Sequence, residues 1–209
     1  MNQTIRILVI PLLVLLLLLS QAGCSERVEP LPPLAHDAVI LAFGDSLTYG
    51  TGASAEDSYP AVLSRLTGRE VINAGVPGEV SRDGLRRLPD LLDRHRPHLL
   101  LLAHGGNDML RRQDLEQMER NLEEMVLLAR ERGIPVVLLG VPRPSIMGLS
   151  SADAYYNVAK ATGTPLEDSV IPQVIANSEL RSDRVHPNAT GYRKMGEAVY
   201  ELLQHSGAL

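Results

Sequence analysis

The sequence predicts an α/β fold, a three-layer α/β/α sandwich with a mainly parallel sheet. Short apolar runs alternate along the 209-residue chain with longer segments whose hydrophobic residues recur at the helical period. Runs of the first kind are typical of strands buried on both faces, as in a parallel sheet. The helices between them then serve as right-handed crossovers that cover both faces of the sheet.

Four segments are predicted to be strands of this sheet. The first is Val39-Ile40-Leu41-Ala42-Phe43, a wholly apolar run that ends at Gly44. The other three cover residues 70–74, 98–103 and 135–141. We expect all four strands to be buried on both faces.

The clearest helical pattern covers residues 114–132. Asp114 is an N-cap candidate with Gln117 three residues later, and Gly133 follows the last helical residue. The apolar residues of this segment share one face of a helix: Leu115, Met118, Leu122, Met125, Val126 and Ala129. An amphipathic helix that packs one face on the sheet is therefore expected here.

Three further helices are predicted. Residues 58–67 and 83–94 have the helical pattern, although Pro89 lies inside the second segment. The last helix begins near Asn188, and its apolar stripe consists of Tyr192, Met195, Val199, Leu202 and Leu203. Residues 38–209 are therefore expected to form one domain.

The N-terminal segment, residues 1–23, is predicted to be an export signal. An apolar run over residues 7–19 follows Arg6, and it is shorter than the roughly 20 residues that a membrane-spanning helix needs. Ala22-Gly23-Cys24 resembles the processing site of bacterial lipoproteins, although Gln21 departs from that pattern, and ordinary signal cleavage near Ala22 or Gly23 is the alternative. We expect an exported, periplasmic protein that is anchored to the membrane through a lipid on Cys24.

A tether is expected between the lipid and the domain. Residues 25–37 contain three prolines and two glutamates, which favour an extended spacer over a packed element. Cys24 is the only cysteine, so no intrachain disulfide can form. The formal net charge is −5 and no long basic run is present, which argues against a nucleic-acid partner. We expect a monomer.

Two motifs far apart in the sequence carry the groups that activate a serine. Gly44-Asp45-Ser46-Leu47-Thr48 contains the serine, and Asp183-Arg184-Val185-His186 contains an aspartate three residues before a histidine. A serine becomes a nucleophile when a neighbouring base takes its proton, and the base needs a group that orients it. We predict Ser46 as the nucleophile, His186 as the general base and Asp183 as the residue that orients the imidazole.

Two further motifs offer donors for a developing oxyanion. Asn73-Ala74-Gly75 supplies the backbone N–H of Gly75, and Gly105-Gly106-Asn107-Asp108 supplies the side-chain amide of Asn107. Ser46, Gly75 and Asn107 each follow a predicted strand, and ligands bind at the carboxyl ends of parallel strands. Each motif alone is also typical of turns and helix caps, so the prediction depends on their joint occurrence.

These four blocks, in this order, resemble those of the SGNH or GDSL hydrolase family, above all its bacterial acyl-esterases, thioesterases and lysophospholipases. The likeness extends from Val39 to the C-terminus. It implies a flavodoxin-like fold, a triad of Ser46, Asp183 and His186, an oxyanion hole of Ser46, Gly75 and Asn107, and no metal or organic cofactor. Two positions depart from the family pattern: Arg184, where glycine is commoner, and His104 before Gly105.

Three other protein classes are weighed against this resemblance. The α/β-hydrolase fold places its serine in G-x-S-x-G, whereas Leu47-Thr48 follow Ser46 here. Residues 50–55 satisfy G-x-G-x-x-A, but the next strand ends without the acidic residue that a dinucleotide site needs. A non-catalytic exported lipid- or glycan-binding protein stays open as an alternative, although it has no need for the complete triad.

The expected reaction is hydrolysis of a carboxylic ester or thioester through an acyl-enzyme. The expected substrates carry short or medium acyl chains and include lysophospholipids, and removal of acetyl groups from a cell-envelope polysaccharide is the alternative. Residues 142–149 follow a predicted strand and are candidates to line an acyl channel through Ile146, Met147 and Leu149.

Overall fold

The computed structural model describes residues 30–145 and 148–209. Five parallel strands form the central sheet in the order β2-β1-β3-β4-β7. Their bounds are β1 Val39–Gly44, β2 Glu70–Gly75, β3 Leu99–Ala103, β4 Val136–Leu139 and β7 Leu166–Glu167. A second, antiparallel pair consists of β5 (Pro142–Ser145) and β6 (Gly148–Ser151).

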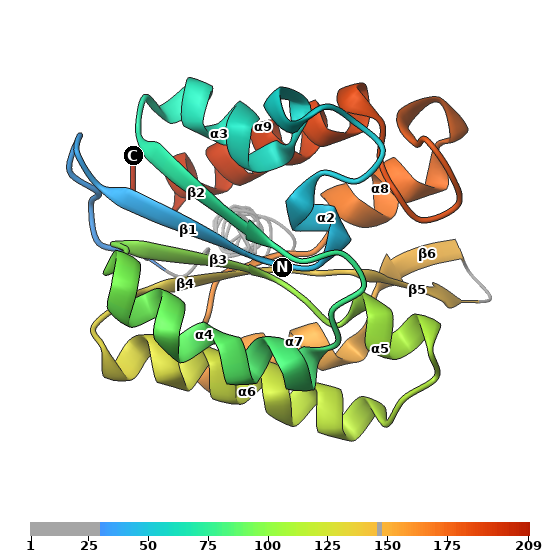
Figure 1. Ribbon diagram of the computed structural model, residues 1–209, viewed down its shortest axis with the longest axis horizontal. Helices are drawn as coiled ribbons and strands as arrows, with labels where there is room; N and C mark the ends of the chain where they lie inside the picture. The colour runs from blue at the N-terminus through green and yellow to red at the C-terminus, as the bar shows by residue number, and fades with distance from the viewer. Residues whose placement is uncertain (1–29, 146–147) are drawn as a thin grey trace, which may run out of the picture.

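Helices cover both faces of this sheet, which confirms the predicted three-layer α/β/α sandwich (Figure 1). One face carries α2 (Ser46–Tyr49), α3 (Tyr59–Thr67), α8 (Val170–Ala176) and α9 (Ala189–His205). The other face carries α4 (Ser81–His95), α5 (Gly106–Leu110), α6 (Leu115–Glu131) and α7 (Asp153–Thr162). Two short 3₁₀ helices, η1 (Ala55–Asp57) and η2 (Ser178–Leu180), lie in connecting segments.

The predicted central strands are buried as expected, but the second one is not. Nearly all of β1 and all of β3 and β4 are buried, because helices pack on both of their faces. By contrast, β2 is half-exposed along its whole length, since it is an edge strand with β1 as its single neighbour. The prediction that residues 70–74 are buried on both faces is therefore wrong.

The caps and packing of the predicted helices follow the sequence signals. The Asp114 carboxylate accepts hydrogen bonds from the N–H groups of Glu116 and Gln117 at the start of α6. In α9, Asn188 caps the first turn in the same way through the N–H of Gly191. Pro89 is accommodated inside α4. The structure adds β7, α7 and α8, for which the sequence analysis made no prediction.

Part of the predicted spacer belongs to the globular body. Leu31 and Leu34 are buried in the core, and their N–H groups donate to the carbonyls of Ser206 and Ala208 at 2.9 Å each. Arg69 also donates to the Leu34 carbonyl, at 2.7 Å. The structure therefore contradicts an extended tether over the second half of residues 25–37. Within the described part of the chain, no helix is long and apolar enough to cross a membrane.

Three buried tyrosines tie the core to the loops at the carboxyl edge of the sheet. The hydroxyl of Tyr155 donates to the His104 carbonyl at 2.6 Å, and the hydroxyl of Tyr192 donates to the Thr51 carbonyl at 2.8 Å. Tyr59 shares a hydrogen bond of 3.3 Å with the side chain of Thr48 in α2. Because each hydroxyl is buried and paired, the loops that follow β1 and β3 are held in one position.

Candidate active site

Ser46 lies where β1 gives way to α2, at the carboxyl edge of the sheet. The Asp45 side chain caps this short helix by accepting from the Leu47 N–H at 3.0 Å. Since β1 lies between β2 and β3, the loops that follow all three strands meet around Ser46. The structure thus places the predicted nucleophile at the position expected for a ligand-binding residue of an open parallel sheet.

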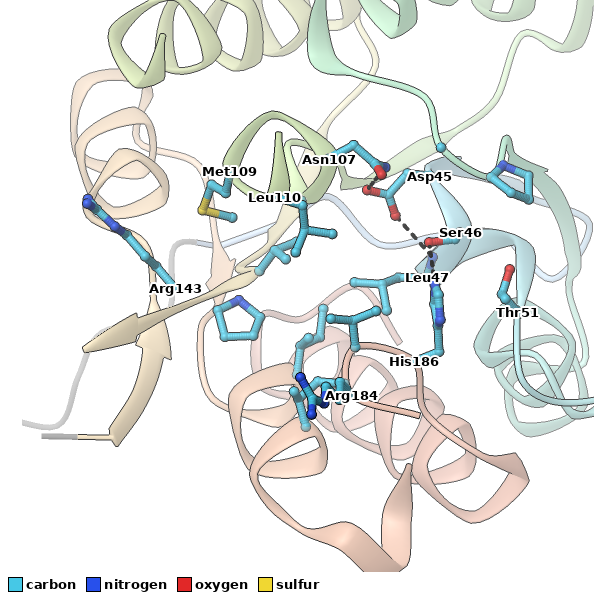
Figure 2. A pocket seen from close by; sticks show the side chains of 18 of the residues that line it. Asp45, Ser46, Leu47, Thr51, Asn107, Met109, Leu110, Arg143, Arg184 and His186 are labelled. Atoms are coloured by element: carbon cyan, nitrogen blue, oxygen red, sulfur yellow. Dashed lines mark hydrogen bonds between the residues drawn. The ribbon is translucent and has the colours of Figure 1, made fainter. Parts of the chain in front are cut away.

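His186 and Asp183 reach Ser46 from the loop before α9. The Nε2 atom of His186 lies 3.0 Å from Ser46 Oγ (Figure 2). The Nδ1 atom of the same imidazole lies 2.7 Å from Asp183 Oδ2. With the proton on Nδ1, the imidazole donates to the carboxylate and accepts from the serine hydroxyl. The three predicted residues are therefore joined in one hydrogen-bonded chain.

Asp183 is held as a carboxylate by the loop that carries it. Its second oxygen, Oδ1, accepts from the N–H groups of Val185 at 2.8 Å and His186 at 2.9 Å. Partial burial opposes ionisation, but the hydrogen bonds from the His186 side chain and from these two N–H groups outweigh it and lower the pKa of Asp183 to about 2. Asp183 consequently orients the imidazole as an anion across the physiological range.

Asn107 lies in α5, directly after β3, and its amide faces the same edge. Its Nδ2 atom donates to the Glu79 carbonyl at 3.0 Å and to Asp45 Oδ2 at 3.2 Å (Figure 2). Asp45 is buried, and this burial raises the pKa of its carboxyl. The amide predicted as an oxyanion donor is thus fixed beside Ser46 by two acceptors from different loops.

Gly75, the other predicted donor, does not face the site. Its N–H donates to the Asn73 side chain at 3.0 Å, and Gly75 is not among the residues that line the pocket. A side chain at this position would place its Cβ 2.1 Å from the backbone nitrogen of Tyr49. Gly75 is therefore needed for close packing of β2 against α2, and its assignment to the oxyanion hole is wrong.

Gly78, three residues after Gly75, does face the pocket. Pro77 and Gly78 form the centre of a turn closed by a 3.1 Å hydrogen bond from the Glu79 N–H to the Val76 carbonyl. Gly78 has φ +79°, as the third residue of a type II turn requires, and it lines the pocket together with Ser46 and Asn107. Among the described residues its N–H has no acceptor, so it is available to a ligand. The Pro-Gly pair is the sequence signal that could have identified this turn.

A buried polar network holds the Gly78 loop in place. Glu79 accepts two hydrogen bonds from Arg87, at 2.6 and 2.9 Å, and one from His104 Nε2 at 3.1 Å. The Nδ1 atom of His104 accepts from the Gly105 N–H at 3.0 Å, so the imidazole is neutral and donates through Nε2. His104 is fully buried and does not line the pocket. Its role here is structural.

Ser46, Asn107 and His186 are among the residues that line a pocket of about 1160 Å³. Aliphatic side chains make up much of its wall: Leu47, Met109, Leu110, Leu115, Val141, Leu149, Ile171, Ile175 and Val185. None of the described lining residues is Phe, Tyr or Trp. Leu149 thus lines the pocket as predicted for an acyl channel, whereas Ile146 and Met147 lie outside the described residues.

The fold and this geometry together define a class of protein. A three-layer α/β sandwich that presents a hydrogen-bonded serine, histidine and aspartate at its carboxyl edge is typical of hydrolases that transfer an acyl group to water. Across residues 30–145 and 148–209, no three His, Cys, Asp or Glu side chains are grouped to hold a metal ion.

The chain belongs to the GDSL-like Lipase/Acylhydrolase family, whose model matches residues 42–194. It is 29% identical to the Pseudomonas aeruginosa protein named Esterase TesA over 193 residues, which cover 88% of this chain and 96% of that protein. It is 30% identical to Thioesterase 1/protease 1/lysophospholipase L1 of Escherichia coli K12, covering 93% of this chain and 91% of that protein. The protein is therefore an ester-bond hydrolase.

Solved structures agree with this assignment. The crystal structure of TesA superimposes with a TM-score of 0.72 at 29% identity and covers 79% of this chain and 98% of its own. The psychrotrophic esterase EstA from Pseudoalteromonas sp., in a form inhibited by monoethylphosphonate, has a TM-score of 0.72 at 25% identity and covers 80% of this chain and 97% of its own. EstA is an esterase by name, and both structures share the fold described above.

Proposed function

We propose that this protein hydrolyses carboxylic esters or thioesters of short to medium acyl chains through an acyl-enzyme on Ser46. The observation that carries the proposal is the chain of hydrogen bonds from Ser46 through His186 to Asp183, at 3.0 and 2.7 Å, beside a largely aliphatic pocket. A binding protein gains nothing from this arrangement, whereas acyl transfer needs each of its parts.

In the proposed first step, Ser46 Oγ attacks the carbonyl carbon of the ester while its proton passes to His186 Nε2. The oxyanion that forms is stabilised by the N–H groups of Ser46 and Gly78 and by the Asn107 amide. Asn107 then exchanges its longer hydrogen bond, the 3.2 Å contact with Asp45, for one to the oxyanion. Such donors raise the rate because they are held in place before the charge develops.

Collapse of the tetrahedral intermediate breaks the bond to the leaving group. The alcohol or thiol departs with the proton from His186, and the acyl group stays on Ser46 as an ester. Water then attacks this ester, giving its proton to His186, and the acid is released as Ser46 regains its proton. Asp183 remains ionised throughout and stabilises the imidazolium that forms in both steps.

The lining of the pocket favours acyl chains over sugars. Its aliphatic side chains suit a hydrocarbon chain, and the described lining has no aromatic platform on which a sugar ring would stack. A polysaccharide deacetylase would prefer acetyl esters, whereas we expect hydrolysis of hexanoyl and octanoyl esters at least as fast as of acetyl esters. A clear preference for acetyl would support the deacetylase alternative instead.

The catalytic proposal is tested with a fluorophosphonate probe, which reacts with activated serines. We expect one adduct, located on Ser46 by peptide mass spectrometry, and none in Ser46→Ala. His186→Ala should react far more slowly, because the general base is lost. An adduct on another serine, or full esterase activity in folded Ser46→Ala, would contradict the proposal.

We further propose that the protein is exported and anchored through a lipid on Cys24. Leu31, which packs in the core, follows Cys24 by seven residues, so the intervening chain reaches at most about 25 Å. Leu31 contacts the end of α9, whereas the pocket lies near its start. An anchor at Cys24 would therefore hold the end opposite the pocket near the membrane. Cys24→Ser should move the protein to the soluble fraction, and continued membrane association would contradict the lipid anchor.

A further inference from the structure

Four arginines line the pocket of an otherwise acidic protein: Arg112, Arg143, Arg181 and Arg184. The formal net charge of the chain is −5, yet the described lining contains a single carboxyl group, that of Asp45. Asp45 is buried, and its side chain is engaged with the Leu47 N–H and the Asn107 amide. Positive charge is thus concentrated at the site against the overall charge of the molecule.

The guanidinium groups of these four arginines form no salt bridge with a described residue. The arginines that do form salt bridges in the described part of the chain lie outside the pocket lining. Arg181 donates to the Ile175 carbonyl at 3.1 Å. The guanidinium groups of Arg112, Arg143 and Arg184 make no hydrogen bond with another described residue. Unpaired cations that line a concave site attract anions more strongly than the same charges on a flat surface.

The four residues come from three separate segments that meet at the pocket. Arg112 follows α5, Arg143 lies in β5, and Arg181 and Arg184 belong to the loop before α9. Figure 2 shows Arg184 near Leu47 and His186, and Arg143 at the side of the pocket away from Ser46. An extended ligand whose ester group lies at Ser46 would therefore meet guanidinium groups along its length.

We propose that this arginine cluster binds an anionic group on the substrate, a phosphate or a carboxylate, and makes the enzyme selective for negatively charged amphiphiles. The inference rests on the proposed esterase activity, and it adds the charge of the preferred substrate. Guanidinium groups match the oxygens of phosphate and carboxylate through paired hydrogen bonds. The aliphatic wall of the same pocket takes up the acyl chain, so one site accommodates both halves of such a molecule.

The test compares two esters that differ by one phosphate group, decanoyl lysophosphatidic acid and 1-decanoylglycerol, each below its micelle concentration. We expect kcat/KM for the anionic ester to exceed that for the neutral ester by about tenfold at low salt, and the ratio to fall as ionic strength rises. Decanoyl-coenzyme A, compared with the decanoyl thioester of a neutral thiol, tests whether a phosphate on a larger leaving group is recognised in the same way. If the enzyme prefers the anionic compound in the first pair alone, the ligand of the arginine cluster is a lipid headgroup. If it prefers the anionic compound in the second pair alone, the ligand is a soluble thiol that carries phosphate.

The matched variants are Arg184→Gln, Arg112→Gln and their combination, with Arg94→Gln as the control. Arg94 is exposed in the last turn of α4, just before β3 begins, and therefore lies at the amino edge of the sheet, opposite the edge that carries the pocket. Each pocket substitution should lower the anionic-to-neutral ratio by about threefold and the pair by about tenfold, mainly through KM. The ratio is independent of the fraction of enzyme that is folded, and Arg94→Gln should leave it unchanged.

Two results would overturn the inference while the proposed function stands. One is equal hydrolysis of charged and neutral esters by the wild-type protein. The other is a ratio that falls as much in Arg94→Gln as in the pocket variants, which would show attraction by general surface charge. Failure to hydrolyse any of the esters, together with no fluorophosphonate adduct on Ser46, would instead overturn the proposed function and the inference with it.

Discussion

Replacing Glu79 by glutamine should destabilise the protein in a way that depends on pH. The Glu79 side chain is 9% exposed, and its carboxylate accepts from Arg87 and His104. Arg87 also stacks over the ring of Phe43, 4.4 Å from its centroid, so the ion pair adjoins the core. Glutamine keeps the size of the side chain and removes the charge, which isolates the electrostatic contribution of the carboxylate.

The magnitude follows from the pKa of Glu79. Burial opposes ionisation, but the hydrogen bonds from His104 and Arg87 outweigh it and lower the pKa from 4.5 to about 2. A carboxyl whose pKa is lowered by folding stabilises the protein above its unfolded pKa, and this contribution is lost as pH falls toward the folded value. At 1.36 kcal/mol per pKa unit, the carboxylate contributes about 3 kcal/mol at pH 7 and about 1.4 kcal/mol at pH 3.

The assay is urea unfolding of wild type and Glu79→Gln at several pH values between 3 and 7. We expect the difference in unfolding free energy to shrink by about half as the pH is lowered. Glu124→Gln, on the exposed face of α6, makes the same change in charge without a described partner and should differ little from wild type at any pH. If the unfolding free energies of wild type and Glu79→Gln differ by the same amount from pH 3 to 7, the reasoning is refuted, because the loss of a titrating charge must change stability in a pH-dependent way.

Four further substitutions test the site and the strand beside it. Asp183→Asn should lower kcat by a factor on the order of 10⁴ with little change in stability, because the imidazole loses the partner that fixes its tautomer; a small effect in steady-state assays would remove Asp183 from the triad. Asn107→Ala should lower kcat by about 10²–10³-fold and KM much less, and an unchanged kcat would exclude the amide as a donor. Gly78→Ala should reduce turnover more than thermal stability, whereas Gly75→Ala should mainly reduce stability, since its Cβ would lie 2.1 Å from a backbone nitrogen of α2; equal effects of the two on both measurements would argue against the reassignment.

The sequence predicts the central part of the fold because local pattern and burial agree there. Every residue of β3 is apolar and buried, so any position other than the interior of a sheet would expose a continuous hydrophobic segment. In α6 the helical period, the Asp114 cap and the glycine after the helix all indicate the same element. Such agreement leaves few alternatives for these segments.

Burial of an individual strand depends on its neighbours, and these are not encoded within the strand. The segment that forms β2 has Val71, Ile72 and Ala74 in common with an interior strand, yet it pairs with β1 alone, and its polar residues Glu70 and Asn73 are exposed. Similarly, α8 is apolar on most sides and contains Pro172, so it lacks the amphipathic pattern that identifies a surface helix. Both properties are set by tertiary packing.

The triad could be predicted because its parts obey simple rules of position. Ser46 follows a buried strand, and Asp183 lies close enough in sequence to His186 for a contact within one loop. The role of a glycine is harder to infer, since any glycine can offer an N–H. Gly75 donates its N–H to Asn73 within its own strand, whereas the Gly78 N–H, in the turn after Pro77, has no acceptor among the described residues.

The position of the Asn107 amide is set by hydrogen-bond partners on two other loops. Asn107 bonds to Asp45, 62 residues away in sequence, and to the carbonyl of Glu79, 28 residues away. A loop at the edge of a sheet cannot be fixed by burying apolar side chains, because it must stay open to the ligand, so hydrogen bonds between loops fix it instead. Each contributes only about 1 kcal/mol, but a partner left unsatisfied costs more, which makes the network cooperative. Substitutions at Glu79 should therefore lower kcat as well as stability, although no atom of its side chain lines the pocket.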